Sequence, residues 1–379
     1  MVAKMRAVHL KEPSREDPAS GVEVAEVDRP QPGQGKVLVN IILRPVNPAD
    51  IFSLQGVYPG FQPKAYPAVP GLEGVGVIEE NGPGAGKYKP GQRVVGAPWP
   101  VQSGNGTWQQ YMAVSEERLG HGEGKRVGRQ NAKGQCRVSL QAAVSMCFTV
   151  REAECGLAKF PVPDDVTDEA AAQFFVNPVA VYGMLHVLNV PKGEYLLQTA
   201  GGSVLGRMTI ELAKHYGIKT ISVVRGDHHV QELKDLGADE VIVSETGEDL
   251  ADHVKKITDG KGAYGATECV GGDLFAHVAA SVRKGGHVLI YGAMAGMEAK
   301  FFIPDLLFRD VTLRGFWIAT WMHSMSTEER GKVVADIMQL LEKKVITPHS
   351  GDRFSFDQVK EAIAKATASG RGGKVLLEG

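Results

Sequence analysis

The segment from Leu196 to Gly217, LLQTAGGSVLGRMTIELAKHYG, constrains the fold of this chain more than any other. A short apolar run meets a glycine-rich turn, and apolar residues at helical spacing follow until a glycine ends the pattern. This order of strand, glycine turn and helix is typical of a dinucleotide-binding turn. The usual G-x-G-x-x-G pattern is incomplete, because a serine stands at the position of the middle glycine. The turn residues are Gly201, Gly202, Ser203, Val204, Leu205 and Gly206.

Three positions of the turn predict specific contacts. We expect Gly201 to permit the sharp turn out of the strand and Gly206 to let the helix pack close to the sheet. Ser203 is expected to cap the helix and to offer its hydroxyl to a phosphate. The N–H groups at a helix N-terminus, together with the helix dipole, favour an anion here. For the motif taken alone, a glycine turn that only packs is the alternative.

Strand-like runs alternate with helical patterns after this turn. Such alternation predicts a parallel sheet with helices on both faces. Ligands of open sheets of this kind bind at the carboxyl ends of the strands, so the glycines after the later runs would let backbone approach a cofactor. The runs are EYLLQTA, TISVVR, EVIV, AYGATECV and HVLIYG.

The second run ends in Arg225, nineteen residues after Gly206. An NAD-selective site favours a carboxylate at this position, because it holds the ribose 2′-hydroxyl and repels a 2′-phosphate. An arginine instead binds a 2′-phosphate through paired hydrogen bonds. We therefore predict NADPH as the cofactor. Asp227 is the competing candidate for the ribose contact, and a solvated arginine is the plain structural alternative.

The rest of the chain predicts a second domain. Residues 1–119 contain short β-like runs between glycines and prolines, such as KVLVNIILRPVN, which is typical of a compact, mostly β domain. The segment 120–159 has no clear period, and we interpret it as a poorly ordered insertion rather than a metal or redox module. After Tyr291, an amphipathic helix over Val333 to Leu341 and a strand–helix–strand end are expected to complete the first domain or a subunit interface.

Cysteine usage and charge narrow the chemistry and the partners. The irregular cysteine spacing fits no common zinc pattern and favours a reducing compartment. A net charge of −2 gives no field that would favour nucleic acid or a membrane surface, and no apolar run reaches the ~18 residues of a membrane helix. The first residues show neither a secretory signal nor an evident transit peptide, which favours the cytoplasm. The cysteines are Cys136, Cys147, Cys155 and Cys269.

Two stretches near the N-terminus relate the chain to a known superfamily. In VPGLEGVG, Leu72 stands where the zinc enzymes of the medium-chain dehydrogenase/reductase superfamily carry a zinc-binding histidine, and Glu73 remains. RPVNPADIFSLQG has Asn47 and no cysteine before Asp50, and the sequence has no four-cysteine lobe. Nearly all of the chain outside the insertion therefore resembles a zinc-free branch of this superfamily, with no metal site.

The resemblance implies an α/β fold with two domains. A GroES-like, mostly β catalytic domain would comprise residues 1–176 and 316–379. A Rossmann domain with a doubly wound parallel sheet, residues 177–315, would bind the cofactor. The resemblance also implies a homodimer formed through edge strands of the nucleotide domains, and it leaves Glu73 as a former ion-pair partner.

Within this branch, the stretches VNPADIFSLQGVYPG, VNPVAVYGML and LRGFW are similar to mitochondrial-type trans-2-enoyl-thioester reductases. This similarity implies that Tyr58 is the proton donor and that the protein is mitochondrial. It implies cofactor contacts by Asn177, Ser203, Val204, Leu205, Gly206, Arg225, Tyr291, Gly292, Ala293, Met294, Phe316, Trp317 and Lys374, with Ala319 in the substrate wall.

Several of these residues keep a structural alternative. Asn177 precedes a proline and is also a candidate cap for the helix that follows. Trp317 either lines an acyl channel or packs in the core. His228 and His229 are expected to be solvated, with no role.

The implied reaction is reduction of the C2=C3 double bond of a 2-enoyl thioester. Tyr58 would stabilise the enolate oxygen and supply a proton, since its ordinary pKa of about 10 keeps it protonated at neutral pH. The substrate would be an enoyl thioester or an enone, with CoA or an acyl carrier protein as carrier. One alternative is an NADPH-dependent quinone or small-enone reductase of the same superfamily. Another is a non-catalytic NADPH-binding protein that senses redox state or binds RNA, although the near-neutral charge argues against RNA.

Overall fold

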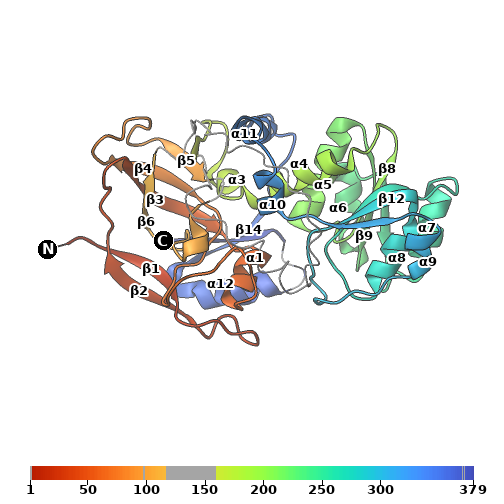
Figure 1. The fold of residues 1–379 in the computed structure, drawn as a ribbon, viewed down its shortest axis with the longest axis horizontal. Coiled ribbons are helices and arrows are strands. Elements are labelled where there is room, and N and C mark those ends of the chain that lie inside the picture. Colours follow the sequence, from red (N-terminus) through yellow and green to blue (C-terminus); the bar gives the residue numbers. More distant parts are fainter. Residues whose placement is uncertain (1, 97–98, 117–158, 369, 371) are drawn as a thin grey trace, which may run out of the picture.

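The computed structural model describes residues 2–96, 99–116, 159–368, 370 and 372–379. Two halves lie side by side along the long axis of the molecule, one mainly of β-strands and one of alternating strands and helices (Figure 1). The predicted insertion, with Cys136, Cys147 and Cys155, lies outside the described residues except for Lys159, with which β7 begins. In the described part of the chain, no helix is long and apolar enough to cross a membrane.

The first half is built around a seven-stranded sheet and a two-stranded sheet of β1 and β2. The central strand β3 is buried along most of its length because it pairs with β4, β6 and β15. The last strands of the chain, β14 and β15, pair with each other and join this sheet through β3, so the C-terminal tail contributes strands to the β-rich half. The strands are β1 (Lys4–Leu10), β2 (Val22–Asp28), β3 (Lys36–Pro45), β4 (Val75–Asn81), β5 (Arg93–Gly96), β6 (Tyr111–Ser115), β7 (Lys159–Pro161), β14 (Ser350–Ser355) and β15 (Lys374–Glu378).

The second half contains a six-stranded parallel sheet in the order β10-β9-β8-β11-β12-β13. The order reverses between β8 and β11, and sheets of this topology bind ligands outside such a reversal. The predicted combination of a mostly β half and a doubly wound parallel sheet is confirmed. The strands are β8 (Tyr195–Gln198), β9 (Lys219–Val224), β10 (Glu240–Val243), β11 (Ala263–Glu268), β12 (Val282–Ile290) and β13 (Thr312–Gly315).

Helices cover the sheets and join the two halves (Figure 1). Apolar residues of α4, α5 and α11, including Met184, Leu212 and Ile337, form one hydrophobic cluster that also contains Leu43 and Val75 of the β-rich half. Because one core spans both halves, it fixes the walls of the site between them. The helices are α1 (Pro48–Leu54), α3 (Asp168–Ala172), α4 (Val176–Leu188), α5 (Val204–Tyr216), α6 (Val230–Leu236), α7 (Leu250–Ile257), α8 (Leu274–Ser281), α9 (Ile303–Leu307), α10 (Ile318–His323), α11 (Thr327–Glu342) and α12 (Val359–Thr367).

Candidate active site

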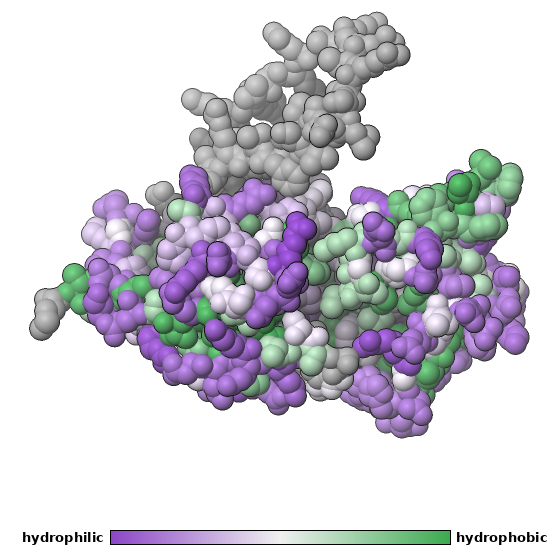
Figure 2. Space-filling view, turned by 90° about the horizontal axis from the view of Figure 1, so that it is seen from below, coloured by the Kyte–Doolittle hydropathy of each residue, from purple (hydrophilic) through white to green (hydrophobic). Residues whose placement is uncertain are grey.

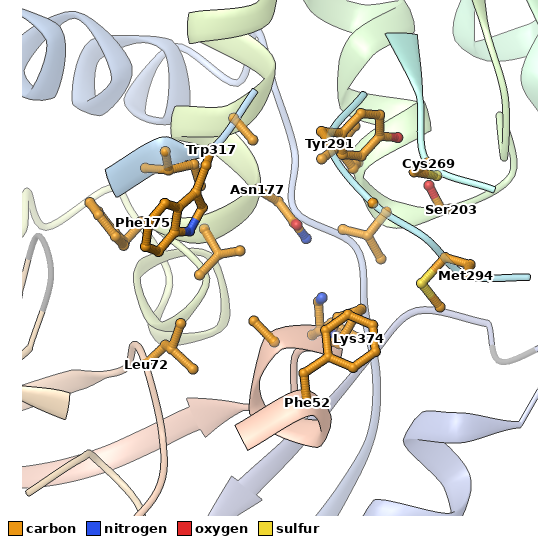
Figure 3. Close-up of a pocket in the computed structure, with 18 of the residues that line it drawn as sticks. Phe52, Leu72, Phe175, Asn177, Ser203, Cys269, Tyr291, Met294, Trp317 and Lys374 are labelled. Atoms are coloured by element: carbon orange, nitrogen blue, oxygen red, sulfur yellow. The ribbon is translucent and has the colours of Figure 1, made fainter. Parts of the chain in front are cut away.

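A pocket of about 1980 Å³ lies between the two halves. Figure 3 shows Ser203, Cys269 and Met294 on one side of it, and Phe52 and Leu72 on the other. Ordinary small-molecule pockets measure roughly 300–1,000 Å³, so this one has room for a dinucleotide and a substrate together. The predicted site residues in its lining are Tyr58, Asn177, Gly202, Ser203, Val204, Leu205, Arg225, Tyr291, Gly292, Met294, Phe316, Trp317, Ala319 and Lys374. Gly201, Gly206 and Ala293 lie next to lining residues but are not part of the lining.

The glycine turn presents the N-terminus of α5 to this pocket. Ser203 is the N-cap residue, and its hydroxyl accepts a hydrogen bond from Gly206 N at 3.0 Å, which confirms the predicted cap. Gly206 lies so close to the preceding turn that a Cβ here would come within 2.5 Å of the Gly201 carbonyl oxygen. Gly206 therefore packs closely against the backbone of the turn, whereas its predicted role in packing the helix on the sheet stays a prediction; the helix dipole points at the space beside Ser203.

The role predicted for Gly201 is wrong. The residue of the turn with a left-handed backbone is Ala200, with a φ of 51°. Gly201 is instead required by packing, since a Cβ there would lie 2.8 Å from the Cβ of Ser222 on β9. The strand next to the turn, and not the sharpness of the turn, excludes a side chain at this position.

Basic residues gather near the end of β9. Arg225 is exposed and lines the pocket, whereas Asp227 is not in the lining. His228 is exposed and His229 partly exposed, as expected for a solvated pair, but both line the pocket, which the sequence did not predict. A Cβ on Gly202 would lie 2.6 Å from the His229 ring, which places that ring against the glycine turn.

Arg207 is a site residue that sequence reasoning missed. Its side chain is 3% exposed and lines the pocket, and its guanidinium donates to the Glu232 carboxylate at 2.8 Å. Burial alone would raise the pKa of Glu232, but the hydrogen bond and charge of Arg207 outweigh it and hold that pKa below its ordinary value. The available signal was an arginine directly after the last turn glycine, in the first turn of the helix.

The ends of β11 and β12 form the wall next to the turn. Glu268, at the end of β11, is fully buried and accepts hydrogen bonds from Val270 N and Gly271 N, which fixes the loop behind the pocket. Burial raises the pKa of the Cys269 thiol to about 11. This thiol is therefore protonated at neutral pH and is a poor nucleophile. Burial also raises the pKa of Tyr291 well above 10.

Tyr58 and Trp317 meet across the pocket although they are 259 residues apart in sequence. Their rings are edge to face, with centroids 6.3 Å apart, and Trp317 Nε1 donates a hydrogen bond to the Tyr58 hydroxyl at 3.3 Å. Burial raises the pKa of Tyr58, the Trp317 hydrogen bond opposes this rise, and the charge of Asp50 adds to it. Trp317 is 38% exposed, so it lines the pocket and is not a core residue.

Glu73 is buried behind the pocket, where it caps α4. Its carboxylate accepts hydrogen bonds from Phe175 N and Val176 N, each at 2.8 Å, and from Asn47 Nδ2 at 2.8 Å. These hydrogen-bond partners are neutral. Burial raises the pKa of Glu73, and these hydrogen bonds and the positive charge of Lys374 oppose the rise, so the role of a former ion-pair partner stays a prediction. The expectation that Asn177 caps this helix is wrong, because Phe175 is the N-cap residue and Asn177 lies within the first turn. Asn177 instead faces the pocket (Figure 3).

The described residues contain no group of three or more His, Cys, Asp or Glu side chains that could hold a metal ion. Leu72, at the position of the zinc-binding histidine, is a buried apolar residue of the pocket lining.

Comparisons with known proteins agree with this architecture. Residues 33–122 match the alcohol dehydrogenase GroES-like domain family, and residues 204–338 match the zinc-binding dehydrogenase family. A mitochondrial enoyl-[acyl-carrier-protein] reductase of Caenorhabditis elegans is 33% identical over 305 residues, which cover 79% of this chain and 74% of that protein. The chain belongs to the medium-chain dehydrogenase/reductase superfamily. The predicted resemblance is thus confirmed at the level of family and fold.

Solved structures support the same fold for this superfamily member. An NADPH:quinone reductase of Bacillus thuringiensis superimposes with a TM-score of 0.80 at 24% identity, over 100% of this chain and 99% of that one. Escherichia coli quinone oxidoreductase, solved with NADPH, gives a TM-score of 0.77 at 18% identity, over 99% of this chain and 100% of that one.

Proposed function

We propose that this protein is an NADPH-dependent reductase that acts on the C2=C3 double bond of 2-enoyl thioesters, with Tyr58 as the proton donor. The observation that carries the proposal is the Tyr58 hydroxyl, which lies in the same pocket as the glycine turn and receives a hydrogen bond from Trp317. The sequence similarity to enoyl-[acyl-carrier-protein] reductases supports the reaction class.

The residues of the turn fit NADPH. The capped N-terminus of α5 offers N–H groups and positive potential to a pyrophosphate, and Gly202, Ser203 and Val204 of this turn line the pocket. Arg225 would bind the 2′-phosphate, which distinguishes NADPH from NADH. Asn177, Lys374 and the stretch from Tyr291 to Met294 would hold the nicotinamide end of the cofactor. When bound, NADPH supplies the hydride that is added to the β-carbon of the substrate.

The protein's own contribution is orientation and proton transfer. Negative charge develops on the substrate carbonyl oxygen as an enolate, and the Tyr58 hydroxyl is the donor placed to stabilise it. Tyr58 then gives its proton to the α-carbon, and the resulting phenolate recovers a proton from water. Apolar lining residues such as Phe52, Leu72 and Phe316 exclude water from the bond being reduced.

The test is NADPH oxidation with crotonyl-CoA and, separately, with 1,4-benzoquinone. We expect thioester turnover to fall by about 10²-fold or more in Tyr58→Phe, which is the usual contribution of a general acid, with NADPH affinity unchanged. Tyr66→Phe removes the same oxygen from an exposed tyrosine outside the pocket lining and should leave turnover unchanged. If the original protein and Tyr58→Phe reduce the quinone at the same rate and neither reduces the thioester, the result would favour a quinone reductase. NADPH binding without turnover of either would favour a non-catalytic protein.

We also propose that the protein is mitochondrial and forms a homodimer. The location rests on the names of the related reductases. The dimer would form at β13, the end strand of the six-stranded sheet, next to exposed apolar residues of the segment 294–308. Figure 2 shows hydrophobic surface at this end of the molecule. The carrier of the acyl group, CoA or an acyl carrier protein, is distinguished by comparing the two thioesters as substrates.

A further inference from the structure

A line of buried hydrogen bonds connects three segments that are distant in sequence. Lys374, the first residue of β15, donates from Nζ to Asn47 Oδ1 at 2.7 Å. Asn47 Nδ2 donates to Glu73 Oε1 at 2.8 Å, and Glu73 Oε2 accepts from Phe175 N and Val176 N at the start of α4. Asn47, Glu73 and Lys374 are 1%, 1% and 5% exposed, respectively, so solvent does not take part in these bonds.

The donor and acceptor groups of the three side chains allow these hydrogen bonds to run in one direction only, from the Lys374 ammonium through the Asn47 amide to the Glu73 carboxylate. An ionised carboxylate only accepts hydrogen bonds and an ammonium only donates them, whereas an amide has one end of each kind. Glu73 accepts at both of its oxygens and therefore turns the Asn47 amide so that its NH₂ faces Glu73. The Asn47 oxygen is then left to face Lys374. If Glu73 did not accept from Asn47, the amide could turn its NH₂ toward the ammonium, where two donors would oppose each other.

Both ends of the line reach the pocket. Lys374 lies in the lining, and its ammonium points toward Asn177 across the pocket (Figure 3). Asn177 belongs to the first turn of α4, the turn whose N–H groups Glu73 binds. One buried carboxylate therefore holds the two walls from which Lys374 and Asn177 approach each other.

We propose that Glu73 is the positioning residue for the nicotinamide end of the cofactor site, acting on Lys374 through Asn47 and on Asn177 through the N-terminus of α4. The inference rests on the proposed cofactor role of Lys374 and Asn177. It also explains why a glutamate follows Leu72, where no metal-binding histidine remains. The carboxylate is needed for the direction of the hydrogen bonds, and its value to the site does not depend on a metal.

The test compares NADPH dissociation constants, measured by fluorescence titration, with thermal stability. Glu73→Gln leaves one oxygen for two sets of donors, so either α4 or Asn47 loses an acceptor. We expect the dissociation constant to rise about tenfold or more, since a buried donor is left unsatisfied. Glu116→Gln makes the same change in a buried carboxylate that binds backbone N–H groups outside the pocket lining. It should leave NADPH affinity unchanged.

A rescue variant separates positioning from general stability. Asn47→Asp alone places two carboxylates face to face and should also weaken NADPH binding. In the double variant, which combines Glu73→Gln with Asn47→Asp, the amide introduced at position 73 donates to the carboxylate introduced at position 47 and accepts from α4. The new carboxylate in turn accepts from Lys374. Every donor then has an acceptor again, so we expect the dissociation constant to return to within about threefold of the original protein.

Three results would overturn the proposal. They are unchanged NADPH affinity in Glu73→Gln, a double variant that binds as weakly as the single variants, and an equal loss in the Glu116→Gln control. If Glu73→Gln does not fold, Asn47→Ala cuts the branch to Lys374 while leaving Glu73 on α4, and unchanged affinity in that variant would also overturn it. Failure of the proposed reaction is distinguishable, since it shows as no enoyl-thioester turnover by original protein that binds NADPH.

Discussion

Glu211 lies on α5, on the face that contacts the segment before β14, where its carboxylate accepts a hydrogen bond from Thr347 N at 2.9 Å. Burial raises the pKa of Glu211 to about 7, and the Thr347 hydrogen bond only partly opposes this rise. The folded protein therefore keeps a proton on Glu211 at a pH where the unfolded chain, with a pKa of about 4.5, has lost it. Folding stability should fall as the pH rises from about 4.5 to about 7, because the folded state binds more protons than the unfolded state in this range.

The size of this loss follows from the pKa values. At 1.36 kcal/mol per pH unit, a rise from 4.5 to about 7 corresponds to about 3.4 kcal/mol for a fully buried group. Glu211 is only partly buried, so solvent screening reduces the value to about 1–2 kcal/mol. Glu211→Gln removes the titration and keeps an oxygen to accept from Thr347 N. The variant should therefore become more stable than the original protein as the pH rises, by about 1–2.5 °C in Tm at pH 8 relative to pH 5.

The assay is the Tm of both proteins at half-unit intervals from pH 5 to pH 8. The useful quantity is the difference in Tm between the variant and the original protein, because other titrating groups cancel in it. Glu329→Gln provides a control with a flat response, since Ser326 holds the pKa of the exposed Glu329 carboxyl below its ordinary value and this carboxylate is ionised throughout the range from pH 5 to pH 8. Parallel Tm curves for the original protein and Glu211→Gln, or a difference that shrinks as the pH rises, would refute the reasoning.

Three further predictions concern the site. Arg225→Ala should weaken NADPH binding by about tenfold or more and leave NADH binding unchanged, since only the 2′-phosphate is lost as a partner; equal losses in titrations with both cofactors would refute its role. Gly206→Ala should lower both the Tm and NADPH affinity, because its Cβ would lie 2.5 Å from a backbone oxygen, whereas Gly331→Ala in α11, which has open space around it, should raise the Tm slightly. Trp317→Phe removes the donor to the Tyr58 hydroxyl and should raise the pKa of that phenol, so thioester turnover should fall without loss of NADPH affinity; unchanged turnover would contradict this.

Local pattern was sufficient to predict the cofactor half of the fold. The glycine turn, the Ser203 cap and the stop at Gly217 all depend on residues within one strand–helix unit, and the structure has each of them. Pattern did not identify which residue takes the left-handed conformation in the turn. Ala200 does so, whereas Gly201 is required because Ser222 of β9 leaves no room for a side chain, and a contact with another strand cannot be read from a short segment.

The site depended more on contacts that are distant in sequence. Asparagine is a residue type that often caps helices, which is why the sequence indicated Asn177 as a candidate cap. In the structure, Glu73, which is 102 residues from Phe175 in sequence, accepts the hydrogen bonds from the N–H groups at the start of α4. Once Glu73 provides the cap, Asn177 is available to face the pocket. Arg207 and His229 were missed for a similar reason, because their placement at the turn follows from the position of α6 and its residue Glu232. The resemblance to known reductases indicated Tyr58 and Trp317 separately, and only the fold brings them into contact.

The electrostatics of the pocket distinguish Tyr58 from the other groups that carry a proton there. Cys269 and Tyr291 are protonated at neutral pH. Desolvation and the negative charge of Glu268 raise the pKa of both groups, because they disfavour the anion that would remain after proton transfer. Tyr58 is partly buried, which also disfavours its anion, but the indole N–H of Trp317 donates to its oxygen and favours the phenolate. A general acid must both hold a proton and be able to release it, so the hydrogen bond from Trp317 is the feature that would suit Tyr58 to the proposed reaction. In the proposed reaction, the LRGFW stretch would contribute through its tryptophan, which donates a hydrogen bond to a tyrosine of the opposite half of the molecule.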